Sequence, residues 1–395
     1  MIEINQKEAC CGCEACYNAC PMQCIQMKYD AEGFKYPFVN KDTCINCGKC
    51  KKACPIINKK SIQYELEECY AAFNDNLTER LNCSSGGIFS LLASAVLSTG
   101  GVVVGTGMSD DCRSTEHVIV NNLSELKTIY GSKYLQSNIN DIFKKIKQQL
   151  EKGNVVLFSG TPCQVAGLQN YLVKPYDNLL CIDVICHGVP SPGLWKKNVD
   201  YIEKKIHSKL VSVNFRCKKY GGHSEYGIAY KNDKQKKAHY SSKEEDPYIQ
   251  MFLNDLSLRP SCYNCKFKGI HRNSDITLGD FWGIDDFAKR LNDGYGVSVV
   301  VVHSNKGKNL FEQIIPYIQN ERVDVKKVFE SHNGEMTKSV VRPDIRESFW
   351  KDYQMNDFAK LSKKYVKIPL KKRIKKTLRR IGILEKVQKM RGGNK

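Results

Sequence analysis

The chain has 395 residues, of which 42% are hydrophobic, and a formal net charge of +19. This length predicts two or more domains with a packed core. No run of 18 apolar residues occurs, and residues 1–9 lack a basic segment followed by an apolar one, so we expect a cytoplasmic protein rather than a membrane-spanning or secreted one. In a reducing compartment, its 19 cysteines indicate metal ligands rather than disulfides.

Two cysteine runs occupy the first 60 residues. Each follows the spacing C-x2-C-x2-C-x3-C with a proline next: Cys10, Cys13, Cys16 and Cys20, then Cys44, Cys47, Cys50 and Cys54. Bacterial two-cluster ferredoxins have this spacing, and the fourth cysteine of each run ligates the other 4Fe–4S cluster. Residues 1–60 are therefore predicted to hold one cluster on Cys10, Cys13, Cys16 and Cys54, and another on Cys44, Cys47, Cys50 and Cys20. Zinc-binding or structural thiols are the alternative.

Two further cysteines of this module, Cys11 and Cys24, fall outside the spacing. We expect them to be small buried residues rather than ligands. A polar linker at 61–68 follows the module.

From residue 69 to about 345, apolar runs alternate with helical stretches. We expect strands at 101–105, 155–158, 179–185, 276–278 and 297–302, and helices at 87–98, 140–152 and 165–171. This alternation predicts an α/β domain with a largely parallel sheet. In such sheets, ligand sites form just beyond the carboxyl ends of the strands.

Four cysteines lie near these strand ends. Cys163 opens a helix after the strand at 155–158, where the helix dipole stabilises a thiolate. Cys186 follows the strand at 179–185, and Cys262 and Cys265 form a Cys-x2-Cys pair. The four could ligate a third cluster, although the pair alone could be half of a zinc site. We expect the remaining cysteines to be unligated: Cys69, Cys83, Cys112, Cys181 and Cys217.

Two glycine-containing segments suggest a site for an anionic cofactor. Cys83-Ser-Ser-Gly-Gly87 opens an apolar helix and offers N–H groups and hydroxyls to a phosphate. Tyr130-Gly-Ser-Lys-Tyr134 with Ser137 adds a cation and more hydroxyls. A plain helix cap is the alternative for the first segment.

In this order, the motifs resemble the beta-subunit family of coenzyme F-420 hydrogenases and dehydrogenases. The resemblance extends from about Cys10 to Trp282 and rests on the segments 10–21, 44–55, 84–87, 131–134, 160–164, 186–188 and 262–265 with 275–279. It is strongest to the bacterial branch with a fused ferredoxin module, which is associated with surface-polysaccharide biosynthesis.

The resemblance implies a flavin, FAD, and a third 4Fe–4S cluster on the four cysteines of the large domain. It also implies flavin-site roles for Ser85, Gly86, Gly87, Lys133 and Thr161. Archaeal members exchange a hydride between the flavin and coenzyme F-420. The His187-Gly-Val-Pro and Asp280-Phe-Trp extensions of this chain resemble the bacterial branch, so coenzyme F-420 is not the substrate we expect.

A flavin can collect single electrons and deliver them as a hydride. We therefore expect an iron–sulfur flavoprotein reductase that takes electrons from reduced ferredoxin or a similar acidic carrier, attracted by the basic body. Its substrate would be a small molecule, such as a sugar or lipid-linked glycan precursor. The alternative is an electron-relay subunit of a larger redox complex, with no substrate site of its own.

His187 and Asp280 are the candidate catalytic residues. His187 could protonate a substrate once hydride arrives, or it could hydrogen-bond a cluster sulfur. Asp280 could act in the same way, or it could cap and pack. Asp183 lies in an apolar strand and must be paired if it is buried.

Arg216 and Lys218 flank Cys217, and His223 follows shortly after. These side chains could receive an anionic substrate or cofactor. A solvated hairpin is the alternative.

The predicted tail, 346–395, is strongly basic. Residues 360–395 hold 15 Lys or Arg and one acidic residue, which is +14 of the net charge of +19. Apolar residues recur there at helical spacing: Leu370, Ile374, Leu378, Ile381 and Leu384. A basic amphipathic helix suits an acidic protein or the inner face of a membrane, and a solvated tail is the alternative. Nucleic acid is not expected, because the run lacks interleaved aromatics.

Overall fold

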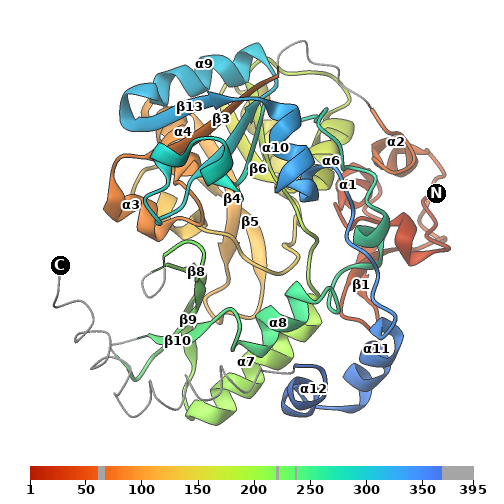
Figure 1. Cartoon of the computed structure of the whole chain (residues 1–395). Coiled ribbons are helices and arrows are strands. Elements are labelled where there is room, and N and C mark those ends of the chain that lie inside the picture. Colours follow the sequence, from red (N-terminus) through yellow and green to blue (C-terminus); the bar gives the residue numbers. More distant parts are fainter. Residues whose placement is uncertain (61–66, 219–221, 236–237, 367–395) are drawn as a thin grey trace.

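The computed structural model describes residues 1–60, 67–218, 222–235 and 238–366. Within them, a small N-terminal module packs against the side of a larger α/β body (Figure 1). Most of the expected linker at 61–68 and the whole expected basic helix at 370–384 lie outside the described residues.

The N-terminal module contains one hairpin and two short helices. Strands β1 and β2 pair antiparallel, and the elements are α1 (Ala15–Ala19), β1 (Ile25–Tyr29), β2 (Lys35–Val39) and α2 (Lys49–Ala53). Both helices follow a residue in the left-handed conformation, Glu14 with φ 56° and Gly48 with φ 74°. The third cysteine of each run, Cys16 or Cys50, therefore lies in the first turn of an equivalent helix.

The body is built on a mixed sheet. Among the described residues it has eight strands in the order β13-β3-β12-β11-β7-β6-β4-β5. Their bounds are β3 (Glu68–Asn74), β4 (Val102–Met108), β5 (Thr115–Val120), β6 (Val156–Gly160), β7 (Leu179–Val184), β11 (Ile276–Asp280), β12 (Ser298–Val302) and β13 (Ile318–Val323).

The parallel arrangement expected from the sequence is confined to the centre of this sheet. Strands β4, β6, β7 and β11 are parallel neighbours, whereas β5, β12, β3 and β13 join antiparallel at the two sides. The expected α/β fold with a parallel-rich sheet is confirmed, and only these side strands depart from the parallel arrangement. Their direction was not evident from the sequence, because a buried strand such as Ser298–Val302 is a continuous apolar run whichever way it points.

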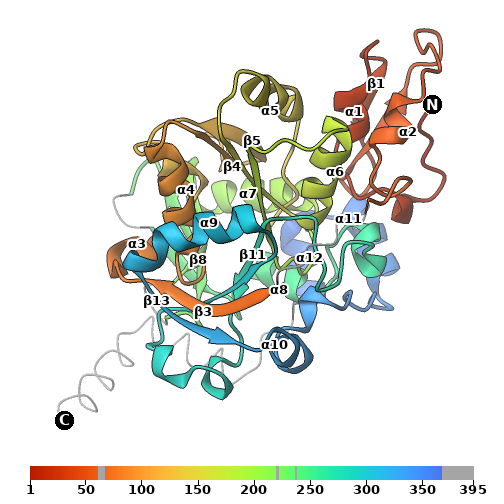
Figure 2. The same cartoon turned by 90° about the horizontal axis from the view of Figure 1, so that it is seen from above.

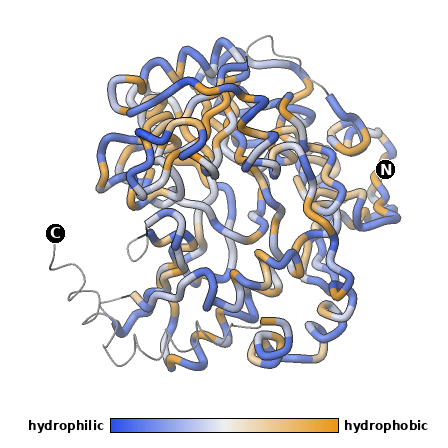
Figure 3. The backbone as a smooth tube through the Cα atoms, viewed as in Figure 1, coloured by the Kyte–Doolittle hydropathy of each residue, from blue (hydrophilic) through white to orange (hydrophobic). Residues whose placement is uncertain are grey.

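Helices cover both faces of the sheet (Figure 2). One face packs on α4 (Ile88–Ser98) and α9 (Asn305–Ile314). The other packs on α5 (Ile142–Glu151) and α6 (Pro162–Leu172) at one end and on α10 (Val325–Ser331) at the other. A further helix, α3 (Leu77–Asn82), leads into α4. Apolar segments gather in this sheet layer, and hydrophilic ones on the outer turns (Figure 3).

A second hydrophobic core lies beside the sheet. It combines an antiparallel sheet with four helices: β8 (Leu210–Cys217), β9 (Gly227–Asn232), β10 (His239–Ser242), α7 (Pro192–Ile206), α8 (Pro247–Leu253), α11 (Arg346–Met355) and α12 (Phe358–Tyr365). Phe349 and Phe358 are almost fully buried in this core. Residues 346–366, expected as the start of a tail, are thus part of the folded body. Their alternating apolar and charged residues are those of helices that bury one side.

None of the helices in the described ranges has an apolar stretch long enough to cross a membrane.

Candidate functional site

The first expected ligand set comes together across the two cysteine runs. The charges of Cys10 and Cys54 act on Cys16, and together with its burial they raise the pKa of the Cys16 thiol. The charges of Cys16 and Cys54 likewise contribute to a raised pKa of the Cys13 thiol. The fold therefore brings Cys54 of the second run to the first three cysteines of the first run, as the crossed pattern requires.

The second expected set lines a cavity of its own. Cys20, Cys44, Cys47 and Cys50 surround it together with Cys24. The Sγ atoms of Cys20 and Cys24 are 3.3 Å apart, and Cys24 is 6% exposed. Cys11 is also buried. The expectation that Cys11 and Cys24 are buried is therefore confirmed.

The four cysteines of the body converge from three separate segments. Cys163 lies in the first turn of α6, Cys186 follows β7, and Cys262 and Cys265 lie at the short 3-10 helix Pro260–Asn264. All four line one cavity. Burial and the charges of the other three raise the pKa of the Cys186 thiol. Four convergent, partly buried thiols form a donor set that fits a 4Fe–4S cluster.

No group of three or more Cys, His, Asp or Glu side chains in the described ranges could hold a single metal ion. This is compatible with cluster sites, because a 4Fe–4S cluster is held by four thiolates spread around several irons rather than by ligands converging on one.

A much larger cavity opens at the carboxyl ends of the central parallel strands. Its volume is about 370 Å³, within the roughly 300–1,000 Å³ that small-molecule sites commonly occupy. Its walls include Gly105 and Thr106 of β4, Gly160 at the end of β6, Ile185 after β7 and Asp280 at the end of β11. This is where ligands bind in open α/β sheets.

Four of the five expected flavin residues line this cavity: Ser85, Gly87, Lys133 and Thr161. The Lys133 ammonium donates to the carbonyl of Tyr130 at 2.9 Å, and burial lowers the pKa of Lys133 to about 7. An anion beside this amine would restore its charge. Thr161 caps α6, and its Oγ1 lies 3.1 Å from the Sγ of Cys163.

The fifth residue, Gly86, lies behind the wall. Its amide donates to Ser298 at 2.9 Å, and a Cβ at this position would lie 2.4 Å from the carbonyl oxygen of Ala72. Glycine is needed here because the loop packs closely against β3 and β12. In a sequence motif, a glycine required for such packing looks the same as a glycine required for ligand contact.

Comparisons with known proteins agree with this arrangement. Residues 153–330 match the family described as the C terminus of the coenzyme F420 hydrogenase/dehydrogenase beta subunit, and residues 9–56 match the 4Fe–4S dicluster domain. Over these ranges the chain is similar to both families. The resemblance inferred from the motifs is thereby confirmed, and the matches indicate an iron–sulfur electron-transfer protein.

Among solved structures, a chain of the F420-reducing NiFe hydrogenase complex from Methanosarcina barkeri is similar at 14% identity and a TM-score of 0.45. The match covers 66% of this chain and 82% of that chain. The comparison with curated proteins finds no match.

The two candidate catalytic residues both line the large cavity of this body, but their surroundings differ. His187 also lines the cavity formed by the four cysteines of the body (the third cysteine cavity). Its Nε2 is 2.6 Å from a carboxylate oxygen of Asp255. Asp280 accepts a hydrogen bond from Arg216 at 2.8 Å. Burial would raise the pKa of Asp280, but the Arg216 guanidinium outweighs it and lowers the pKa.

Arg216 reaches the large cavity from β8. This position agrees with the interpretation that its segment receives an anionic ligand, rather than with a solvated hairpin. Arg216 is 4% exposed and stacks over Tyr226 at 3.9 Å, and its Nε has no hydrogen-bond partner among the described residues. Lys218 has a structural role instead. Its ammonium donates to the carbonyls of Arg80, Ser85 and Tyr295.

Asp183 is buried, and its partners are structural. Thr277 donates to it at 2.6 Å, and Arg272 lies 3.7 Å away. The expectation that a buried Asp183 must be paired is confirmed.

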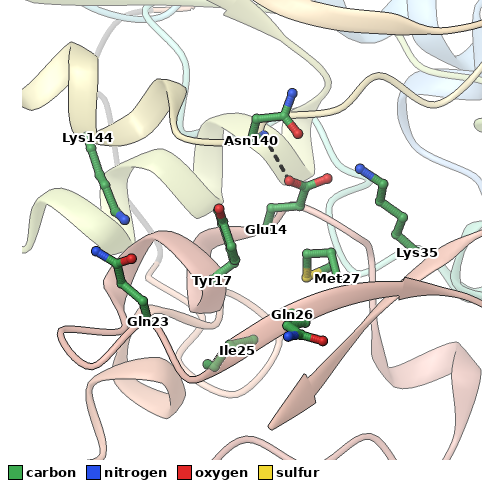
Figure 4. A pocket seen from close by; sticks show the side chains of 9 residues that line it. All are labelled: Glu14, Tyr17, Gln23, Ile25, Gln26, Met27, Lys35, Asn140 and Lys144. Carbon is green, nitrogen blue, oxygen red and sulfur yellow. Dashed lines mark hydrogen bonds between the residues drawn. The ribbon is translucent and has the colours of Figure 1, made fainter. Parts of the chain in front are cut away.

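A separate cavity lies where the ferredoxin module meets the body (Figure 4). The buried Glu14 lines it and accepts a hydrogen bond from the amide of Asn140 at 2.8 Å. Lys35 and Lys144 line it as well. This contact joins the loop before α1 to the segment before α5, and so it anchors the module on the body.

The sequence interpretation missed Arg259, which is fully buried between the ferredoxin module and the third cysteine set. Its position, directly before Pro260 and three residues before Cys262, was the available signal.

Proposed function

We propose that this chain is an iron–sulfur flavoprotein oxidoreductase. Electrons from reduced ferredoxin or a similar acidic carrier enter at the two-cluster module, pass a third cluster in the body, and reduce a small molecule at a flavin in the large cavity. The proposal extends the two family matches, which support iron–sulfur electron transfer only.

One observation carries the proposal: the third cysteine cavity and the large cavity share a wall. Cys163, Cys186 and His187 line both. A group bound in the large cavity would therefore lie directly beside a cluster held by these cysteines.

The residues of the large cavity suit a flavin nucleotide. Such a flavin would combine single electrons into hydride transfer. The amine of Lys133, together with Ser85 and Gly87 of the neighbouring loop, would hold its anionic part, since N–H groups and cations bind phosphate. The apolar wall, which includes Ile88, Phe89 and Leu278, would exclude water from its ring.

Asp280 and His187 would act at the substrate end. The lowered pKa of Asp280 suits a residue that stays ionised and orients Arg216. His187 is the better candidate to supply a proton, since its ring lines the cavity and is held by Asp255.

The alternative is an electron-relay subunit whose chemistry occurs in a partner protein. The word subunit in the name of the matched family favours this interpretation. It differs in one respect that can be measured: turnover would need a second protein even when every cofactor is present.

Anaerobic purification with analysis of iron, sulfide and flavin tests the proposal. About twelve irons and one flavin per chain are expected, because each of three clusters holds four irons. About eight irons without flavin would contradict it. Stopped-flow reduction by ferredoxin, NADH or reduced deazaflavin then identifies the donor, and nucleotide sugars and lipid-linked glycan precursors are the first acceptors to assay.

A further inference from the structure

Arg259 lies at the seam between the ferredoxin module and the body, and its side chain is completely buried. Its guanidinium donates to the carbonyl oxygens of Cys10 at 2.7 Å and Lys35 at 3.0 Å, and to Gln136 at 2.9 Å. Its Nη2 also lies 3.4 Å from the Sγ of Cys10. The guanidinium therefore touches both the backbone and the thiol of an expected ligand of the first cluster.

The charge of Arg259 is balanced in an unusual way. Among the described residues it forms no ion pair with a carboxylate, although burying an unpaired cation is costly. Its polar contacts are instead carbonyl oxygens, the Gln136 side chain and the sulfur of Cys10.

Arg259 lies next to cysteines of two different sites. Cys10 belongs to the first ferredoxin set, whereas Cys262 belongs to the set in the body. The amide of Cys262 donates to the carbonyl of Arg259 at 2.9 Å, so the two residues share one turn. Close by, Cys11 of the ferredoxin module and Cys163 of the body line one cavity. Arg259 therefore lies between the two cysteine sites.

We propose that Arg259 is a positioning residue that stabilises the reduced form of the cluster held by Cys10 and directs electrons from the ferredoxin module toward the body. A cluster gains one negative charge when it takes up an electron, and a buried cation in contact with its ligand favours that state. Hydrogen bonds to a ligand sulfur act in the same direction. Electrons move to the cluster with the more positive potential.

The direction toward the body rests on the proposed function, but the effect on the first cluster does not. That cluster belongs to the dicluster domain at residues 9–56. A potential measured there tests Arg259 even if the body holds neither a flavin nor a third cluster.

The test is an EPR-monitored redox titration of the full chain, with iron analysis of each variant. Arg259→Gln removes the charge, and Arg259→Lys keeps the charge but loses the planar fork. The matched control is Arg346→Gln, because Arg346 is also buried and joins the module to the body through Glu32 at 2.6 Å, yet contacts no thiol in the described ranges. Cys10→Ser identifies which signal belongs to the first cluster.

We expect Arg259→Gln to shift the midpoint of the first cluster to a more negative potential and to leave the second unchanged. Arg259→Lys should give a smaller shift of the same sign, and Arg346→Gln none. Unchanged midpoints in Arg259→Gln with full iron content would overturn the proposal, as would an equal shift in Arg346→Gln. If Arg259→Gln loses the cluster, Arg259→Lys decides: a midpoint more positive than the wild-type value rejects the role.

Discussion

Gly167 of α6 lies against Cys13 of the ferredoxin module so closely that a Cβ on the glycine would be 3.0 Å from the Sγ of Cys13. Helix α6 also carries Cys163 in its first turn. One helix therefore supports a ligand of the first cluster from its middle and presents an expected ligand of the third at its start. This relationship makes the distance between the two sites depend on rigid secondary structure.

Gly167→Ala should consequently disturb the first cluster. The added methyl group must displace Cys13 or the helix, and overpacking of this kind typically costs about 1–3 kcal/mol. We expect lower thermal stability and partial loss of iron from the ferredoxin module. Gly334→Ala is the control, because a Cβ there meets nothing within 4 Å. Equal melting temperatures and iron contents for both variants would show that the contact is not tight.

Cys262→Ala should remove one cluster and leave the ferredoxin module intact. The cavity around Cys262 holds three other expected ligands, and losing one of four thiolates should release roughly four of about twelve irons. Iron and sulfide analysis with EPR of the two remaining clusters measures this. Cys217→Ala, in β8, is the control and should keep full iron. Full iron in Cys262→Ala would argue against the third cluster.

Lys133 should make stability depend on pH. Burial lowers its pKa to about 7, whereas in an unfolded chain lysine titrates near 10.4. Between these values the unfolded state binds more protons, so the free energy of unfolding should rise with pH from about 7 to about 10. Below pH 7 both states are protonated and the full cost of the buried charge remains, on the order of a few kcal/mol.

Urea unfolding of flavin-free protein at pH 7, 8.5 and 10 measures this slope. Lys133→Met should flatten it, and Lys127→Met, at an exposed position nearby, should not. A bound anionic cofactor should also flatten it, since the anion raises the pKa of Lys133 again. Identical slopes in wild type and Lys133→Met would contradict the assignment.

Arg346→Ala should loosen the ferredoxin module. The Arg346 guanidinium binds both carboxylate oxygens of Glu32, at 3.0 and 2.6 Å, and the carbonyl of Leu258. Breaking a buried pair by removing one partner typically costs about 3–5 kcal/mol. Hydrogen exchange in the hairpin 25–39 should become faster. Arg342→Ala is the control, because its ion pair with Glu347 is exposed and such pairs contribute little to stability. Equally fast hydrogen exchange in both variants would show that Arg346 does not anchor the module.

Much of the fold and of the site followed from local patterns. All five expected strands and the three expected helices are present, although α6 begins at Pro162 rather than at residue 165. The expectation that Cys163 opens a helix agrees with this start, which the capping box of Thr161 and Gln164 defines. The antiparallel side strands and the packing of α11 and α12 were missed, since strand direction and helix partners depend on residues far away in sequence.

The sequence by itself determined the two-cluster module, because all eight ligands lie in two short runs whose spacing is set by the cluster. It also identified the four cysteines of the body as candidates. Only the tertiary structure decided that these four converge, that their cavity shares a wall with the large one, and that Arg259 lies between Cys10 and Cys262. Parallel strands β6, β7 and β11 bring together loops that are more than 20 residues apart in the sequence. The role of a buried arginine depends on contacts, such as that of Arg259 with Cys10, which cysteine spacing does not predict.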